Sequence, residues 1–138
     1  MDFEGKVALV TGGGRGIGKA AATKFAEGGA DIVIADIDPQ TAKDTAEEIS
    51  ALGVRAFSIS LDIGDIGQIE NMVHEAVSKL GSVDILFNNA GLTRHISFFD
   101  IEEDHWDQIN RVNAKGAFFC MQKVANQMVE QARGGRII

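Results

Sequence analysis

The 138-residue sequence has no tyrosine, one proline, one cysteine and no long apolar run. Without a stretch of about 20 apolar residues, it offers no candidate transmembrane helix. The lone cysteine, Cys120, excludes an internal disulfide, and a single proline is too few for a linker-rich or disordered chain. The first residues also lack the basic and then apolar layout of a secretory signal peptide. We therefore expect a cytoplasmic protein with no membrane partner.

Positive charge is also scarce, since 13 Lys and Arg stand against 20 Asp and Glu, for a formal net charge of −7. Without a basic patch, nucleic acid is not an expected partner. The three histidines lack cysteine or histidine partners at metal-ligand spacing, so no metal site is predicted. The length suits one domain over residues 1–138, which can bury about two-thirds of its unfolded surface.

Short apolar segments alternate with amphipathic stretches along the chain. Strands are predicted over 6–10, 31–35, 55–60 and 83–87 and from 134 onward, and helices over 17–27, 39 to about 53, 65–81 and about 102–131. Apolar strands joined by amphipathic helices are typical of a parallel sheet covered on both faces. Right-handed crossovers favour a doubly wound, Rossmann-like α/β fold with strand order 3-2-1-4-5, truncated at the fifth strand. Asp38 and Asp65 are the expected N-caps of their helices.

The most informative motif is TGGGRGIG, residues 11–18, between the first strand and the first helix. Glycines allow a sharp turn and let a ligand approach without a Cβ in the way. The first turn of the helix offers unpaired N–H groups and a positive dipole end to an anion. Gly12, Gly16, Ile17 and Gly18 are therefore candidates for binding a dinucleotide pyrophosphate. Their spacing is not G-x-G-x-x-G, and a turn without a ligand is the alternative.

A second signal follows the predicted strand over 31–35. Asp36 lies about 20 residues beyond the glycines, where an acidic residue accepts hydrogen bonds from the adenosine ribose hydroxyls. Its neighbour Ile37 is a further candidate contact. An ordinary strand-end aspartate is the alternative interpretation.

Further candidates occupy the ends of the third and fourth strands. Asp62 can accept a hydrogen bond from an adenine amino group, with Ile63 beside the ring. Asn89, Ala90 and Gly91 form a tight turn where backbone can approach a ribose, although such residues also suit turns without a ligand. Ligands of doubly wound sheets bind beyond the carboxyl ends of the strands, where the strand order reverses. All these segments are therefore expected to form one composite site.

In this order, the TGGGRGIG motif, Asp62, NNAG at 88–91 and VNAKG at 112–116 resemble the short-chain dehydrogenase/reductase family. The likeness is greatest to its 3-oxoacyl-carrier-protein reductase-like and polyol dehydrogenase-like branch and spans nearly the whole chain. It implies an NAD-dependent oxidoreductase that interconverts an alcohol and a ketone by hydride transfer. It also implies a small-molecule substrate and a homo-oligomer, either a dimer or a tetramer. Asn113 would have a catalytic role, holding a water in a proton relay.

Two residues admit other interpretations. Asparagine is disfavoured inside a helix because its amide competes for backbone hydrogen bonds, so Asn113 can instead mark a junction between two shorter helices. A basic residue at Arg15 contacts the 2′-phosphate in NADP-preferring relatives, but a solvated loop cation is equally consistent with the sequence. The carboxylate of Asp36 would repel that phosphate, so we predict NAD in preference to NADP.

The chemistry implied by the resemblance needs a serine, and a tyrosine with a lysine four residues later, all beyond the fifth strand. This chain has no tyrosine and ends at Ile138. We expect the N-terminal part of a longer enzyme, inactive on its own. The alternatives are a non-catalytic dinucleotide-binding module and an interaction protein that keeps the fold.

Overall fold

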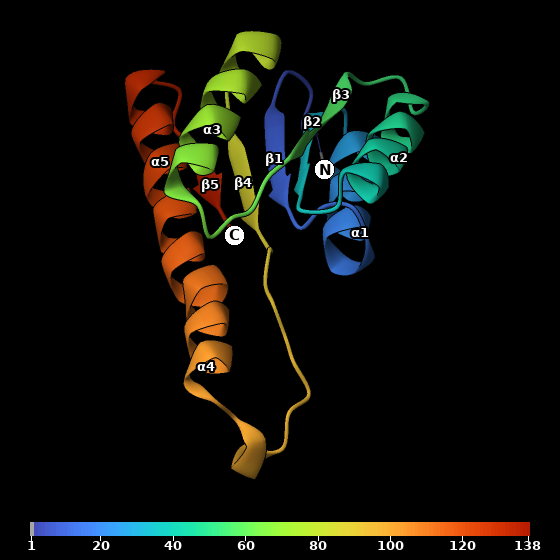
Figure 1. The fold of residues 1–138 in the computed structure, drawn as a ribbon. Helices are drawn as coiled ribbons and strands as arrows, with labels where there is room; N and C mark the ends of the chain where they lie inside the picture. Colours follow the sequence, from blue (N-terminus) through green and yellow to red (C-terminus); the bar gives the residue numbers. More distant parts are fainter. Residues whose placement is uncertain (1) are drawn as a thin grey trace.

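A five-stranded parallel sheet lies between two layers of helices in the computed structural model, which describes residues 2–138 (Figure 1). The strands are β1 (Val7–Thr11), β2 (Asp31–Asp36), β3 (Ala56–Ser60), β4 (Ile85–Asn88) and β5 (Arg136–Ile137). Their order is β3-β2-β1-β4-β5, and every neighbouring pair is parallel. The predicted doubly wound α/β fold is thereby confirmed, with the strand order reversing between β1 and β4.

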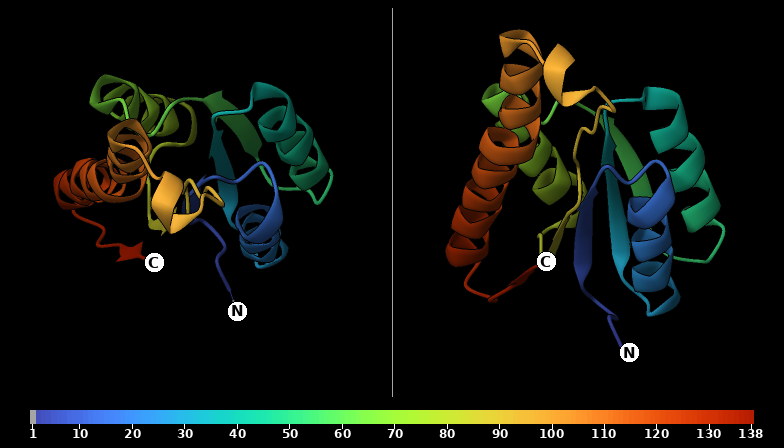
Figure 2. Two further views of the ribbon diagram at one scale, coloured as in Figure 1. Left: turned by 60° about the horizontal axis from the view of Figure 1, so that its bottom comes forward. Right: turned by 90° about the horizontal axis from the view of Figure 1, so that it is seen from below.

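The helices divide between the two faces of the sheet (Figure 2). On one face lie α1 (Gly16–Glu27) and α2 (Pro39–Ser50), and on the other lie α3 (Ile66–Leu80) and α5 (Ala117–Glu130). The carboxyl ends of the strands carry η1 (Phe98–Asp100), α4 (Glu103–Asn110) and the π-helical segment η2 (Arg111–Gly116), which lead into α5.

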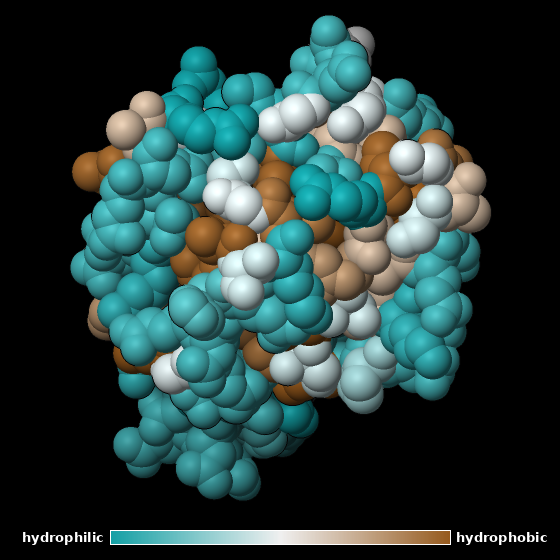
Figure 3. All heavy atoms as spheres, turned by 90° about the horizontal axis from the view of Figure 1, so that it is seen from above, coloured by the Kyte–Doolittle hydropathy of each residue, from teal (hydrophilic) through white to brown (hydrophobic). Residues whose placement is uncertain are grey.

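The alternation of side chains along the strands builds two separate cores. Val7 and Leu9 of β1 face the core under α3 and α5, whereas Ala8 and Val10 face the core under α1 and α2. All four side chains are buried because both faces of the sheet are covered. Figure 3 shows the face at the top of Figure 1, which is mainly hydrophilic and has apolar residues in small separate areas.

Helix starts follow the predicted capping. The Asp38 carboxylate accepts hydrogen bonds from the backbone N–H groups of Gln40 and Thr41, with Pro39 in the first turn of α2. Asp65 caps α3 in the same way. Its carboxylate accepts from the backbone N–H groups of Gly67 and Gln68 and from the Gln68 side-chain amide. These hydrogen bonds lower the pKa of Asp65, and the one from the Gln68 side chain has the largest effect. No helix within residues 2–138 is long and apolar enough to cross a bilayer.

Most predicted bounds lie within one to three residues of the observed ones, and two differences have a structural cause. The fourth strand begins at Ile85 and not at Val83, because the backbone of Val83 is bound by the side-chain amide of Gln131. The helix expected over about 102–131 is interrupted by the π turns of η2. A π turn contains an extra residue and widens the helix locally, and such turns are frequent at functional sites.

Candidate functional site

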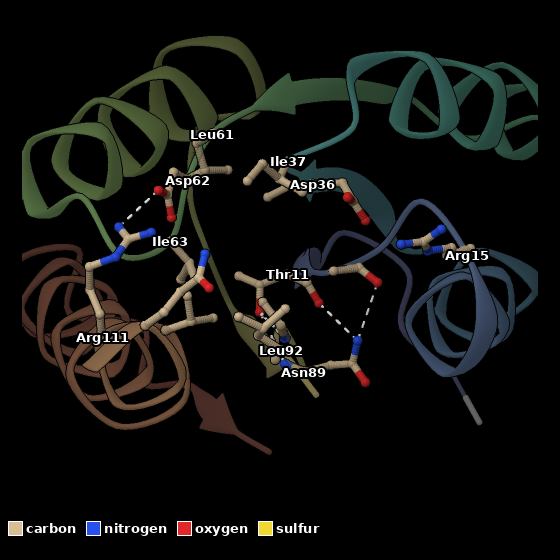
Figure 4. A pocket seen from close by; sticks show the side chains of 16 residues that line it. Thr11, Arg15, Asp36, Ile37, Leu61, Asp62, Ile63, Asn89, Leu92 and Arg111 are labelled. Carbon is tan, nitrogen blue, oxygen red and sulfur yellow. Dashed lines mark hydrogen bonds and ion pairs between the residues drawn. The ribbon is translucent and has the colours of Figure 1, made fainter. Parts of the chain in front are cut away.

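A pocket of about 350 Å³ lies at the carboxyl ends of β1 to β4 (Figure 4). Its walls come from the four strand ends and from the helical face formed by α4 and η2. The lining residues are Thr11, Gly12, Arg15, Ala35, Asp36, Ile37, Leu61, Asp62, Ile63, Asn89, Ala90, Gly91, Leu92, Gln108, Arg111 and Val112. The pocket spans the point where the strand order reverses, which is the ligand site of doubly wound sheets.

The glycine-rich turn, the start of α1 and the turn after β4 (the β4 turn) pack so closely that side chains are excluded at Gly12 and Gly18. A Cβ on Gly18 would lie 2.1 Å from the carbonyl oxygen of Gly12, and one on Gly12 would lie 3.1 Å from the Ala90 Cα. Gly12 also has a φ of +62°, a left-handed conformation that glycine adopts without strain. The turn therefore leaves bare backbone and the N-terminus of α1 beside the pocket, a cradle suited to a phosphate group.

Thr11 and Asn89 join this turn to the end of β4. The Thr11 hydroxyl oxygen accepts from the backbone N–H groups of Asn89 and Ala90, both at 3.0 Å. In return, the Asn89 side-chain amide donates to the carbonyls of Thr11 at 3.1 Å and Gly12 at 3.2 Å. The neighbouring Asn88 amide instead donates to the carbonyl of Ala117, which fixes β4 to α5.

Asp36 presents its carboxylate at the end of β2, held by backbone on both oxygens. Oδ2 accepts from the N–H of Gly14 at 2.9 Å, and Oδ1 accepts from the N–H of Asp38 at 3.1 Å. A carboxylate has about four lone-pair sites, so both oxygens keep capacity for a ligand hydroxyl. Arg15 lies on the same side of the pocket, exposed to solvent and without an ion pair to Asp36.

Asp62 occupies the corresponding place beyond β3. Its Oδ1 accepts from the N–H of Gly64 at 2.8 Å, and its Oδ2 forms an ion pair with Nη1 of Arg111 at 2.8 Å. Ile63, which follows it, is buried beside the pocket. The pocket therefore has a fixed carboxylate at two of its four strand ends.

Asn113 lies outside the pocket wall, in η2. Its side-chain Oδ1 accepts from the N–H of Leu92 at 2.7 Å, and its Nδ2 donates to the Leu92 carbonyl at 2.8 Å. Since Leu92 does line the pocket, Asn113 contacts the site through that backbone. The alternative interpretation, a junction between two shorter helices, agrees with the position of η2 between α4 and α5, and the relay role stays a prediction.

The pocket brings together nine predicted residues: Gly12, Arg15, Asp36, Ile37, Asp62, Ile63, Asn89, Ala90 and Gly91. Gly16, Ile17 and Gly18 form the start of α1 beside it and are not among the lining residues. Seven lining residues are not among the predicted ones: Thr11, Ala35, Leu61 and Leu92 at the strand ends, and Gln108, Arg111 and Val112 on the helical wall. The i, i+3, i+4 spacing of the last three places them on one helix face, and this spacing was visible in the sequence. Within residues 2–138, no three His, Cys, Asp or Glu side chains gather where they could hold a metal ion.

Comparison with known proteins identifies relatives of the same architecture. The chain is 41% identical over 139 residues to 2-dehydro-3-deoxy-D-gluconate 5-dehydrogenase of Dickeya dadantii, covering 100% of this chain and 54% of that protein. It is 41% identical over 134 residues to the 3-oxoacyl-[acyl-carrier-protein] reductase FabG of Staphylococcus aureus, covering 96% of this chain and 54% of the reductase. The chain therefore spans about half the length of these relatives.

A solved structure of NAD⁺-bound xylitol dehydrogenase superposes with a TM-score of 0.94 at 33% identity, covering 99% of this chain and 53% of that one. These relatives match the reductase-like and polyol dehydrogenase-like branch that the sequence motifs indicate. The family model for short chain dehydrogenases matches residues 6–138. The chain belongs to the short chain dehydrogenase family.

Proposed function

We propose that this chain is the NAD-binding part of an oxidoreductase that interconverts an alcohol and a ketone by hydride transfer. One observation carries the proposal: a single pocket connects a side-chain-free phosphate cradle with fixed carboxylates at the ends of β2 and β3. An elongated ligand with an anionic centre and hydroxyl-bearing ends matches that arrangement.

The residues of the pocket suit the parts of a dinucleotide. The backbone of Gly12 and the start of α1 would hold the pyrophosphate. Asp36 would accept from the adenosine ribose, and Asp62 with Ile63 would receive the adenine. The turn of Asn89, Ala90 and Gly91 would approach the second ribose. When bound, the nicotinamide ring supplies the chemistry of hydride exchange.

NAD is favoured over NADP by the position of Asp36. Both carboxylate oxygens are already held by backbone N–H groups, so the charge cannot easily turn away from an approaching 2′-phosphate. Arg15 has no ion pair that fixes it toward such a phosphate. A carboxylate held by two backbone groups, beside an arginine exposed to solvent, supports discrimination in favour of the 2′-hydroxyl.

We further propose that the chain alone binds cofactor without turnover. It has no tyrosine, which is the residue implied to transfer the proton in the enzymes that this sequence resembles. We propose that Asn113 holds a water in the proton relay of the longer enzyme, as the family resemblance implies. Loss of a general acid or base typically costs 10²–10⁴-fold in rate.

An interface is a second function with its own support. Phe98, Phe99 and Trp106 are 83%, 91% and 65% exposed, and Val129 of α5 is 79% exposed. These side chains lie on three of the helical elements between β4 and β5, and large exposed apolar side chains are typical of interaction surfaces. We propose that η1, α4 and α5 contribute to a homo-oligomer, either a dimer or a tetramer.

Calorimetric titration of the chain with NAD and NADP tests the proposed function. We expect saturable binding of both, with at least tenfold preference for NAD, together with no oxidation of NADH in the presence of simple ketones and keto-sugars. Tighter binding of NADP would refute the cofactor preference. Absence of binding of either nucleotide would refute the binding function and leave the interface as the remaining candidate.

A further inference from the structure

We propose that Arg111 is a positioning residue for adenine recognition, acting by fixing the carboxylate of Asp62. This inference rests on the proposed function, because it assumes that the dinucleotide occupies the pocket with its adenine near Asp62. The ion pair joins two parts of the chain that meet only in the fold, the turn after β3 and the first residue of η2 (Figure 4).

The ion pair controls the orientation of the carboxylate. Arg111 Nη1 lies 2.8 Å from Asp62 Oδ2, while the Gly64 N–H holds Oδ1 at 2.8 Å. With a donor on each oxygen, rotation about the Cβ–Cγ bond is opposed on both sides. One lone-pair direction on each oxygen stays free for an amino group.

Two glycines make this contact possible. A Cβ on Gly64 would lie 2.1 Å from Arg111 Nη1 and 2.6 Å from its Cζ, so the guanidinium occupies the space of the missing side chain. A Cβ on Gly116 would lie 2.5 Å from the carbonyl oxygen of Ile63. The backbone of η2 therefore rests directly on the turn that carries Asp62 and Ile63.

The same π segment holds the opposite wall of the pocket. Asn113, two residues after Arg111, binds the backbone of Leu92 through both atoms of its amide. One segment of six residues thus braces the wall beyond β3 and the loop beyond β4. Each brace acts on a different end of the pocket, so each can be tested with a different part of the ligand.

The positive charge of Arg111 gives a second reason why an arginine suits this position. Asp36 and Asp62 put two negative charges in a pocket proposed to take a pyrophosphate. Pairing with a guanidinium neutralises Asp62 while leaving it an acceptor for a neutral donor such as the adenine amino group. Both side chains are partly exposed, at 41% for Arg111 and 30% for Asp62. The pair is therefore expected to affect binding more than folding, because exposed ion pairs contribute little to stability.

The experiment compares ADP-ribose with 1,N6-etheno-ADP-ribose, in which the adenine amino group is blocked. Dissociation constants are measured by calorimetry for the 138-residue chain and for Arg111→Met, which keeps the apolar stem and removes the charge. We expect Arg111→Met to weaken ADP-ribose binding about fivefold, the loss of one well-oriented hydrogen bond, and to change binding of the etheno ligand less than twofold.

Two further variants separate positioning from general charge and from folding. Lys115→Met removes an exposed cation of the same segment that lies outside the pocket wall, and it should leave both ligands within twofold. Arg111→Met in an Asp62→Asn background should cost less than twofold for ADP-ribose, because the carboxylate it positions is gone. Arg111→Lys keeps the charge without the planar fork and should recover only part of the affinity. If Arg111→Met does not fold, Arg111→Lys is used in its place to compare the binding of the two ligands.

The outcomes distinguish this inference from the function on which it rests. Equal loss for both ligands, or no loss for either, overturns the role of Arg111 while leaving dinucleotide binding intact. Additive losses in the double variant also overturn it. If the unmodified chain binds neither ligand, the proposed function fails first and the inference fails with it.

Discussion

The side-chain amide of Asn113 pairs with the backbone of Leu92 in both directions, accepting at 2.7 Å and donating at 2.8 Å. Among side chains, the carboxamide of Asn or Gln offers a neutral donor and acceptor in the arrangement of a peptide group. The loop after β4 has no strand neighbour at this point, and Asn113 supplies the missing pairing. This contact gives a physical reason for an asparagine inside a helix.

The first prediction concerns stability. Asn113→Ala should lower the free energy of unfolding by about 1 kcal/mol, since two hydrogen bonds of about 1 kcal/mol each are lost and the better helix propensity of alanine returns about 0.7 kcal/mol. Urea denaturation of the chain measures the difference. Asn113→Asp is the comparison variant, because it keeps the acceptor for the Leu92 N–H and puts a carboxylate oxygen, in place of the donor, against the Leu92 carbonyl. A more stable alanine variant would show that helix propensity outweighs the Leu92 contact.

Much of the fold could be predicted because it depends on local and periodic signals. The run Val7–Val10 and the amphipathic helices between strands give the parallel sheet, and the crossover rule gives its order. Asp38 was recognisable as a cap because a capping carboxylate binds the N–H groups two and three residues later. These features require no knowledge of distant contacts.

The parts that escaped prediction depend on contacts between distant segments. Asn113 could be recognised as an unusual residue inside a helix, but no local signal predicts the π turns of η2 or the contact of Arg111 with Asp62, 49 positions away in the sequence (111 − 62). Thr11 was visible in the motif, but its two hydrogen bonds from the β4 turn exist only after β1 and β4 pair. The roles of the predicted site residues toward a ligand stay predictions.

The second prediction concerns nucleotide selectivity. Asp36→Ala should weaken NAD binding about three- to tenfold, since a charged acceptor for ribose hydroxyls is lost, and should strengthen NADP binding because the opposing charge is gone. Asp36→Asn is the matched variant, as it removes the charge and keeps an acceptor for the Gly14 N–H, although its NH₂ group cannot accept from the Asp38 N–H. Calorimetry with both nucleotides gives the ratio. An unchanged ratio in both variants would mean that Asp36 does not face the 2′ position.

The third prediction concerns the only cysteine. Burial raises the pKa of the Cys120 thiol to about 12, and its side chain is fully enclosed in the core under α3 and α5. The thiolate fraction at pH 9 is then about one in a thousand, so the native chain should not react with an aromatic disulfide reagent between pH 7 and pH 9. In urea the same thiol should react rapidly. Labelling of the native chain at the rate seen in urea would contradict the burial of Cys120.

The fourth prediction tests the close packing beneath the phosphate cradle. Gly18→Ala places a Cβ 2.1 Å from the Gly12 carbonyl oxygen and 2.9 Å from the Asn89 side-chain amide, so α1 must move away from the β4 turn. The free energy of unfolding should fall by about 1–3 kcal/mol, as for other overpacked sites, and nucleotide affinity should fall with it.

Gly67→Ala is the matched control for this change. Gly67 lies in the first turn of α3, has no contact tighter than 3.4 Å from its added Cβ, and keeps its N–H bond to Asp65. Because alanine is the better helix former, Gly67→Ala should raise stability by up to about 1 kcal/mol and leave nucleotide binding unchanged. Opposite signs for the two glycine variants would show that Gly18 is required by packing and not by backbone flexibility. If Gly18→Ala were as stable as the unmodified chain and bound NAD equally well, the turn would accommodate a methyl group at Gly18, which would contradict this prediction.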